Sequence, residues 1–171
     1  MHECRLTRWI SCGHLTRCPL GSCWCAGDVQ GFTAKPRATA DGQTNLLQWA
    51  CSIPGKEGTA WAGAVYELTL EFTEDYPTRP PRCTFSGQKR PFHPNVCPSS
   101  GEAAMALLNE DEGWRQELTI AQVLRGIQDF LANPNSDDAA AAHAEAHQLH
   151  VLDRPAYWER VRQEAVGLSP R

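Results

Sequence analysis

What decides the fold is the stretch between residues 76 and 95, which reads YPTRPPRCTFSGQKRPFHPN. Five of its residues are proline, and proline fixes φ and has no N–H group to donate. The run from Tyr76 to Pro81 therefore predicts a rigid corner rather than the middle of a helix or strand. A second motif, His93-Pro94-Asn95, follows that corner by about a dozen residues. The chain on the two sides of this stretch shows different periodicities.

Before the corner, apolar and polar residues alternate as they do in half-buried strands. The alternation covers residues 32–34, 45–53 and 65–72, with turn residues between them at 40–42 and 54–58. Regular patterning continues as far as Phe85. Strands that follow one another through short turns pair antiparallel. We therefore predict a four-stranded antiparallel meander.

After Phe85 the strand pattern ends, and residues 86–114 predict a long, shaped loop of the kind that is usually functional. Thr119 then opens a helix whose apolar residues recur every three or four positions until Asn133-Pro134. A second helix is predicted from about Asp138, with Asp137 or Asp138 as its cap, to His150. A third is predicted from about Pro155 to Ala165. Strands followed by helices indicate an α+β fold.

Length and charge limit the function. The 171 residues carry a net charge of −4 and accommodate one domain with a short extension. We assign the domain to residues 31–168 and a Cys-rich extension without regular patterning to residues 1–30. The acidic balance gives no reason to expect nucleic acid or an anionic membrane as a partner. No run approaches the 18 or more apolar residues of a membrane span.

Five of the eight cysteines crowd the first 25 residues. With His14, four of them (Cys12, Cys18, Cys23 and Cys25) offer zinc ligands, but their spacing matches no standard pair of knuckles, and we expect no metal. The N-terminus also lacks the pattern of a secretory signal. We therefore expect reduced thiols and a location in the nucleus and cytoplasm.

Taken in order, three local signatures resemble the ubiquitin-conjugating fold over residues 31–166. They are the Tyr76–Pro81 corner, the His93-Pro94-Asn95 motif, and Trp114-Arg115 ahead of a helix that Pro134-Asn135 closes. Three further segments, residues 53–61, 92–96 and 109–113, are similar to the SUMO-conjugating branch of that family. The resemblance implies transfer of SUMO from a cysteine thioester to a substrate lysine, with ATP used upstream by the activating enzyme and no cofactor bound.

The resemblance places Ala104 at the position of the nucleophile. The family segment resembles Pro-Ser-Gly-x-x-Cys-Leu-x-Ile-Leu, and here residues 98–108 are one residue longer. Matching Gly101 and Leu107-Leu108 puts Ala104 on the cysteine, within one residue either way. A thiolate forms readily near neutral pH and leaves easily, whereas an alanine methyl cannot form a thioester. We therefore expect no covalent modifier on this chain.

Other site residues follow from the same resemblance. Asn95 matches the residue that stabilises the oxyanion or holds the adjoining loop, and Asp138 the acid that orients the incoming lysine. His93 and Pro94 are expected to brace the loop. Cys97 stands where the SUMO-conjugating branch has a tyrosine that lines the channel for the substrate lysine. We interpret Cys97 either as a plain loop residue or as a relocated nucleophile. Arg82 retains the positive charge that, in this branch, binds an acidic residue of the substrate. Glu102 stands where the family has a threonine, and its negative charge is expected to repel such a residue.

The implied partners are a SUMO-like modifier, ligases and lysine-bearing substrate proteins. Residues 1–30 do not form the basic helix that docks the activating enzyme in this family, so that partner is doubtful. Two hypotheses stay open. The chain is a SUMO-conjugating enzyme in a disabled form, or it is a non-catalytic module that binds SUMO, ubiquitin, a ligase or a substrate. The clustered changes around Ala104 favour the second, and the retained Asn95 and Asp138 favour the first.

Overall fold

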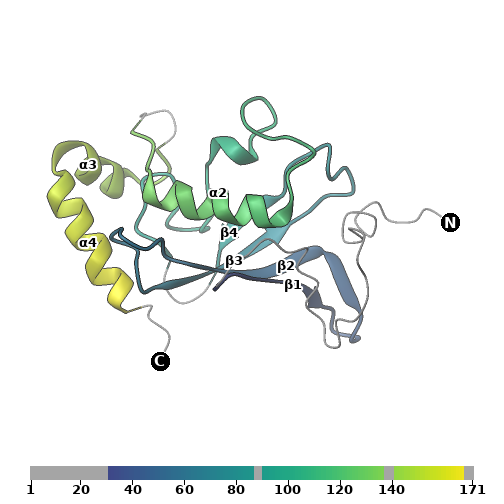
Figure 1. Cartoon of the computed structure of the whole chain (residues 1–171). Helices are drawn as coiled ribbons and strands as arrows, with labels where there is room; N and C mark the ends of the chain where they lie inside the picture. The colour runs from purple at the N-terminus through teal and green to yellow at the C-terminus, as the bar shows by residue number, and fades with distance from the viewer. Residues whose placement is uncertain (1–30, 87–89, 137–140, 168–171) are drawn as a thin grey trace.

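The computed structural model describes residues 31–86, 90–136 and 141–167. Four strands are followed by a short 3-10 helix and three α-helices (Figure 1). They are β1 (Thr33–Ala38), β2 (Thr44–Pro54), β3 (Val65–Glu71), β4 (Arg82–Phe85), η1 (Ala106–Leu108), α2 (Ile120–Ala132), α3 (Ala144–Leu152) and α4 (Arg154–Val166). No helix in these residues is long and apolar enough to cross a membrane.

The strands form one antiparallel sheet in the order β1-β2-β3-β4. This confirms the predicted α+β fold and its meander. The register of β1 against β2 shifts between Pro36 and Arg37. The corner that begins at Tyr76 separates β3 from β4, and the Trp114 indole donates to its Pro77 carbonyl at 2.9 Å. That bond ties the corner to the loop that follows η1.

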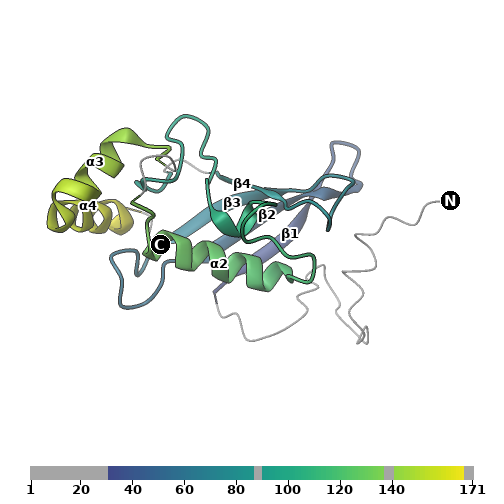
Figure 2. The same cartoon turned by 90° about the horizontal axis from the view of Figure 1, so that it is seen from above.

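The core lies between the sheet and α2, which crosses one face of the sheet (Figure 2). Alternate residues of β2, such as Trp49, Cys51 and Ile53, are buried because successive side chains of a strand point to opposite faces. On α2 the buried residues are Val123, Leu124, Ile127 and Leu131. Burying each such side chain contributes roughly 1.5–3 kcal/mol, so these four residues hold α2 against the sheet.

Helix α2 begins and ends where the sequence indicates. Thr119 accepts from the Gln122 backbone N–H, and the Gln122 side chain accepts from the Thr119 N–H, which makes a capping box. At the other end Asn133 leaves helical geometry ahead of Pro134. Gln128 on α2 donates to the Pro54 carbonyl at 2.8 Å, so the helix is also tied to the end of β2.

Helix α3 begins later than predicted. It starts at Ala144 instead of near Asp138, and its cap is the His143 side chain rather than an aspartate. The reason is that the backbone N–H groups of Ala142 and His143 both donate to the Pro94 carbonyl, at 2.8 and 2.9 Å, and so are not available to a helix. Asp137 and Asp138 lie outside the described residues. Asp153 caps α4, which begins one residue before the predicted Pro155.

Candidate functional site

Ala104 is held in place by its backbone. Its N–H donates to the Asn95 carbonyl at 2.9 Å, and the neighbouring Ala103 N–H donates to the Cys83 carbonyl of β4 at 3.0 Å. Isolated bridges also join Val96 to Ala103 and Thr84 to Glu102. Residues 102–104 are therefore hydrogen-bonded on one side to β4 and on the other to the loop that carries Asn95. The Ala104 side chain itself is exposed.

Next to Ala104, a chain of hydrogen bonds joins the loop that carries Asn95 to the end of α2 and to the loop that follows it. Asn95 is fully buried, and its Oδ1 accepts from the Asn135 N–H at 2.9 Å. The Asn95 N–H donates to His93 Nδ1 at 3.1 Å, and His93 Nε2 donates to the Phe130 carbonyl at 3.1 Å. These bonds connect the His93-Pro94-Asn95 motif to the C-terminal end of α2 and to the loop after it.

The two partners of His93 determine its protonation state. A backbone N–H can only donate, so Nδ1 must be unprotonated, and the Phe130 carbonyl requires the proton on Nε2. Burial disfavours the charged imidazolium and lowers the pKa of His93 to about 3. His93 is therefore neutral near pH 7 and braces the loop. It is not positioned to carry protons for a reaction.

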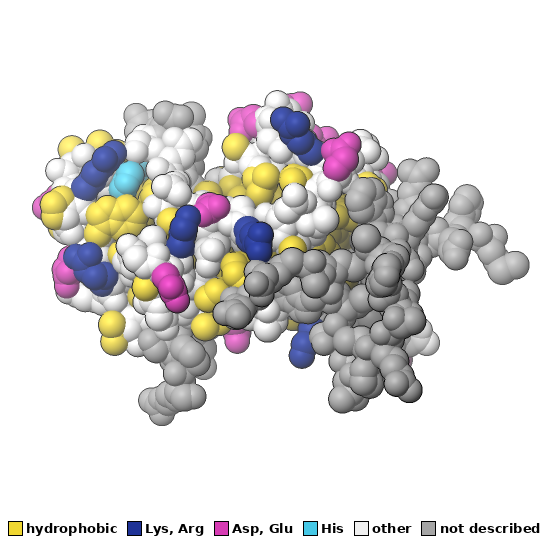
Figure 3. Space-filling view, in the orientation of Figure 1, with side chains coloured by type: hydrophobic (Ala, Val, Ile, Leu, Met, Phe, Trp, Pro, Cys, Tyr) yellow, Lys and Arg dark blue, Asp and Glu magenta, His cyan; other side chains and the backbone are white. Residues whose placement is uncertain are grey.

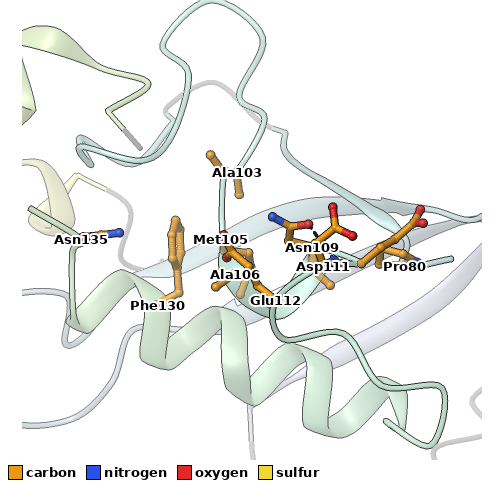
Figure 4. Close-up of a pocket in the computed structure, with 12 residues that line it drawn as sticks. Pro80, Ala103, Met105, Ala106, Asn109, Asp111, Glu112, Phe130 and Asn135 are labelled. Carbon is orange, nitrogen blue, oxygen red and sulfur yellow. Dashed lines mark hydrogen bonds between the residues drawn. The ribbon is translucent and has the colours of Figure 1, made fainter. Parts of the chain in front are cut away.

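Ala104 lies in a groove of about 790 Å³ (Figure 4). Its lining comes from residues 103–106 and 108–112, with Pro80, Phe130 and Asn135. The 3-10 helix η1 approaches α2 closely at this point, because a Cβ added at Gly126 would lie 2.2 Å from Leu107 Cδ2. Glycine at position 126 allows the floor of the groove to rest on the helix.

Cys97 occupies a separate tight turn beside the groove. The Gly101 N–H donates to the Cys97 carbonyl at 2.7 Å, and Arg90 donates to the Pro98 carbonyl at 2.6 Å. Gly101 has φ of +79°, and a Cβ there would lie 2.3 Å from the Phe85 carbonyl oxygen, so only glycine fits. Hydrogen bonds from Ser100 and Ser99 lower the pKa of the half-exposed Cys97 thiol to about 6.

The other two described cysteines are unsuited to nucleophilic chemistry. Cys51 and Cys83 are buried in the core, and burial raises the pKa of both thiols well above the ordinary range. No cysteine among the described residues lines the groove.

Arg82 and Glu102 form an exposed ion pair, with Arg82 Nε 3.2 Å from Glu102 Oε1. From the sequence, these two residues are expected to have opposite effects on an acidic substrate residue, and the structure brings them together. Such an exposed pair contributes only about 0.2–1 kcal/mol to stability, but it gives each charge a partner.

The structure thus joins Ala104, Asn95, His93 and Pro94 in one arrangement. Cys97 does not line the groove, although its N–H donates to the Glu102 carbonyl at 2.9 Å. Asp138 and the candidate zinc ligands before residue 31 lie outside the described residues. The described residues hold no group of three or more metal-ligating side chains. Sequence reasoning assigned no role in the site to Phe130 or Asn135, whose backbones bond His93 and Asn95 across 37 and 40 residues.

The chain thus combines a four-stranded meander, a helix across it, and a His-Pro-Asn loop beside an exposed groove, and these features define a class of protein. The family model for ubiquitin-conjugating enzymes matches residues 24–165, and the chain belongs to that family. A solved structure described as a novel ubiquitin-conjugating enzyme superposes with a TM-score of 0.63 at 32% identity, covering 79% of this chain and 82% of that one.

Within the family, the chain belongs to the SUMO-conjugating branch. It is 44% identical over 142 residues to a SUMO-conjugating enzyme of Arabidopsis thaliana, covering 83% of this chain and 86% of that protein. A Caenorhabditis elegans SUMO-conjugating enzyme is 45% identical, with coverages of 80% and 79%. One from Dictyostelium discoideum is 50% identical over 147 residues, with coverages of 86% and 89%.

Proposed function

We propose that this chain is a SUMO-conjugating-enzyme-like protein of the sumoylation pathway that does not form the thioester of its family. The observation that carries the proposal is the exposed methyl group of Ala104, which faces the groove and is anchored next to Asn95. The family reaction moves SUMO from a cysteine thioester to a substrate lysine. Ala104 has no atom able to attack the incoming thioester.

Among the described residues, no cysteine takes the place of the missing nucleophile in the groove. Cys51 and Cys83 are buried, and Cys97 does not line the groove. Asn95 keeps the family position, and in our proposal it holds the loop next to Ala104 and steadies a developing oxyanion when a thiol is present. Asp138, by the same proposal, orients the substrate amine.

A second function is favoured by the changes around Ala104. Glu102 pairs with Arg82, and the Cys97 turn carries the extra residue of the loop. Changes of this kind alter the substrate side of the site while the fold is kept. They support a non-catalytic module that binds SUMO or ubiquitin, a ligase or a substrate in the nucleus and cytoplasm.

The first experiment mixes the purified chain with SUMO, activating enzyme and ATP and examines the products on gels with and without reducing agent. We expect no adduct that disappears on reduction. Such an adduct would overturn the proposal, and mass spectrometry would locate it. A Cys97→Ser variant run in parallel shows whether Cys97 is the attachment point.

The second experiment separates the two functions with the Ala104→Cys variant. Because position 104 is exposed and held by its backbone amide, the substitution should change the free energy of unfolding by no more than about 0.5 kcal/mol. A variant that folds and acquires a reducible SUMO adduct is a conjugating enzyme lacking only its thiol. A variant that folds and stays unmodified while the chain still binds SUMO is a binding module.

A further inference from the structure

Two backbone carbonyls of the His-Pro-Asn loop are held by the C-terminal helices, which lie side by side beyond one end of α2 (Figures 1 and 2). The Tyr157 hydroxyl of α4 donates to the Phe92 carbonyl at 3.3 Å. The Pro94 carbonyl accepts from the N–H groups of Ala142 and His143, at 2.8 and 2.9 Å, where the chain enters α3. Proline has no N–H group, so this carbonyl is the only backbone hydrogen-bonding group of Pro94.

The Phe92 ring is surrounded by side chains of the same two helices and of the cap of α3. The His143 ring lies edge-on, with 5.1 Å between the ring centroids, and the Tyr157 ring lies 6.0 Å away. The Arg160 guanidinium carbon lies 5.0 Å from the Phe92 ring centroid. A guanidinium within about 6 Å of an aromatic face is attracted by it. Helix α4 therefore contacts Phe92 both at its ring and at its carbonyl.

Arg160 is held above Phe92 by two carboxylates. Its Nε lies 2.9 Å from Glu164 Oε1, one turn along α4, and its Nη1 lies 4.0 Å from Glu145 Oε1 of α3. Basic side chains are visible at the surface over α3 and α4 in Figure 3. Such exposed pairs contribute little to stability. Their effect here is to fix the guanidinium against the Phe92 ring.

The hydroxyl of Tyr157 makes a contribution that its ring does not share. Tyr157 is fully buried, and burial raises the pKa of the hydroxyl above its ordinary value, so the group keeps its proton and donates. A phenylalanine would fill nearly the same space, but it would leave the Phe92 carbonyl without this donor. Loss of the donor to a buried carbonyl is unfavourable. The hydroxyl therefore fixes the position of the Phe92 backbone.

Asn95 is consequently held from two directions. On one side, its Oδ1 accepts from the Asn135 N–H of the loop after α2. On the other, Phe92 and Pro94, which precede it in the chain, are bound to the C-terminal helices. A shift of these two carbonyls would move the Asn95 backbone, and with it the carbonyl that accepts from the Ala104 N–H.

We propose that Tyr157 and Arg160 are positioning residues that set the orientation of Asn95 through the segment from Phe92 to Pro94. Neither residue lines the groove, so each acts only through this segment. The proposal rests on the proposed function for what Asn95 does in a reaction, but not for how Asn95 is placed. Small displacements of a group that stabilises a transition state lower the rate of the chemical step.

Amide NMR of the full chain tests the placement. Tyr157→Phe keeps the aromatic ring and removes only the hydroxyl, so a signal that changes elsewhere reports movement of the backbone. We expect the side-chain amide signal of Asn95 and the backbone N–H signal of Asn135 to shift, while the signals of β2 stay in place. Arg160→Gln should shift the same two signals by a smaller amount. The matched control Arg162→Gln removes the same charge from the same helix, at an arginine that lies over no aromatic ring of the described residues, and should leave both signals in place.

A kinetic measurement distinguishes positioning from a structural role alone. In the Ala104→Cys protein charged with SUMO, Tyr157→Phe should lower kcat for transfer to free lysine about ten-fold and leave KM unchanged. The expected loss is smaller than the factor of about a hundred or more for an oxyanion donor that is removed outright, because Asn95 is displaced but still present. Arg162→Gln should change neither constant.

Unmoved Asn95 and Asn135 signals in Tyr157→Phe, an equal shift in Arg162→Gln, or an unchanged kcat beside shifted signals would each overturn the proposal. If Ala104→Cys folds but acquires no SUMO, the proposed part of Asn95 in transfer fails. The NMR comparison needs neither SUMO nor a thiol, so it still decides whether the C-terminal helices place Asn95.

Discussion

At the scale of single residues, the difference between Cys97 and Ala104 is one of surroundings. Ala104 faces a groove large enough for a peptide, while Cys97 sits in a turn whose serines bond its thiol, with Cys97 Sγ 3.2 Å from Ser99 Oγ. Hydroxyl donors favour the thiolate over the thiol. The chain therefore has an activated thiol near Ala104, but not at position 104, where the resemblance to the family places the nucleophile.

The rate of Cys97 alkylation should report this pKa. Iodoacetamide should modify Cys97 with a rate that rises through pH 6, about two units below the range of an ordinary cysteine. Peptide mapping by mass spectrometry separates Cys97 from the other cysteines. Ser100→Ala should move the midpoint to higher pH, since Ser100 is the largest cause of the shift. A midpoint above pH 8 in the unmodified chain would contradict the expectation.

At the scale of elements, the position of the groove depends on how closely η1 rests on α2. Glycine within a helix costs about 1 kcal/mol relative to alanine. At position 126 that cost is offset by the contact with Leu107, which belongs to η1. Helix α2 thus contains Gly126, which is unfavourable within a helix, because Leu107 of η1 packs against it.

A double-mutant cycle measures how strongly Gly126 and Leu107 are coupled in the free energy of unfolding. Gly126→Ala alone should not stabilise the protein, because overlap with Leu107 costs about 1–3 kcal/mol against a gain of about 1 kcal/mol. In a Leu107→Ala background the overlap is gone, and the same substitution should raise the free energy of unfolding by about 1 kcal/mol. Urea unfolding of the four proteins gives the coupling. Equal effects of Gly126→Ala in both backgrounds would rule out the contact as the cause.

At the scale of the whole molecule, local patterns predict the elements and long-range bonds arrange the site. Alternation predicts β2 and β3, and the helical period with Thr119 and Asn133 predicts α2. The late start of α3 depends on the Pro94 carbonyl, and the bracing of Asn95 depends on Asn135. These partners lie about 40 or more residues apart in sequence, so no local period indicates them. Only the resemblance to a family pointed to Ala104.

The stability of the whole molecule should fall in mild acid. His93 has a pKa of about 3 when folded and about 6.5 in an unfolded chain, so below pH 6.5 only the unfolded state binds this proton. The free energy of unfolding should therefore decrease by up to about 1.4 kcal/mol per pH unit as the pH falls from 6.5 to 5. Burial also lowers the pKa of His150, which acts in the same direction.

Urea unfolding at several pH values measures this dependence. His93→Gln should fold less stably at pH 7 but lose stability more slowly between pH 6.5 and 5. The comparison uses the slope against pH, so a general loss of stability does not obscure it. The same slope in the variant and the unmodified chain would assign the acid sensitivity to other groups.

The backbone anchoring of Ala104 has a consequence in the cell. Because the N–H at position 104, and not its side chain, is what the fold uses, a melting curve cannot distinguish this chain from a version that carries a thiol there. If the chain binds the partners of its active relatives, it occupies them without turnover. Its effect would then be that of a competitor, set by its abundance relative to the active enzyme rather than by any rate constant of its own.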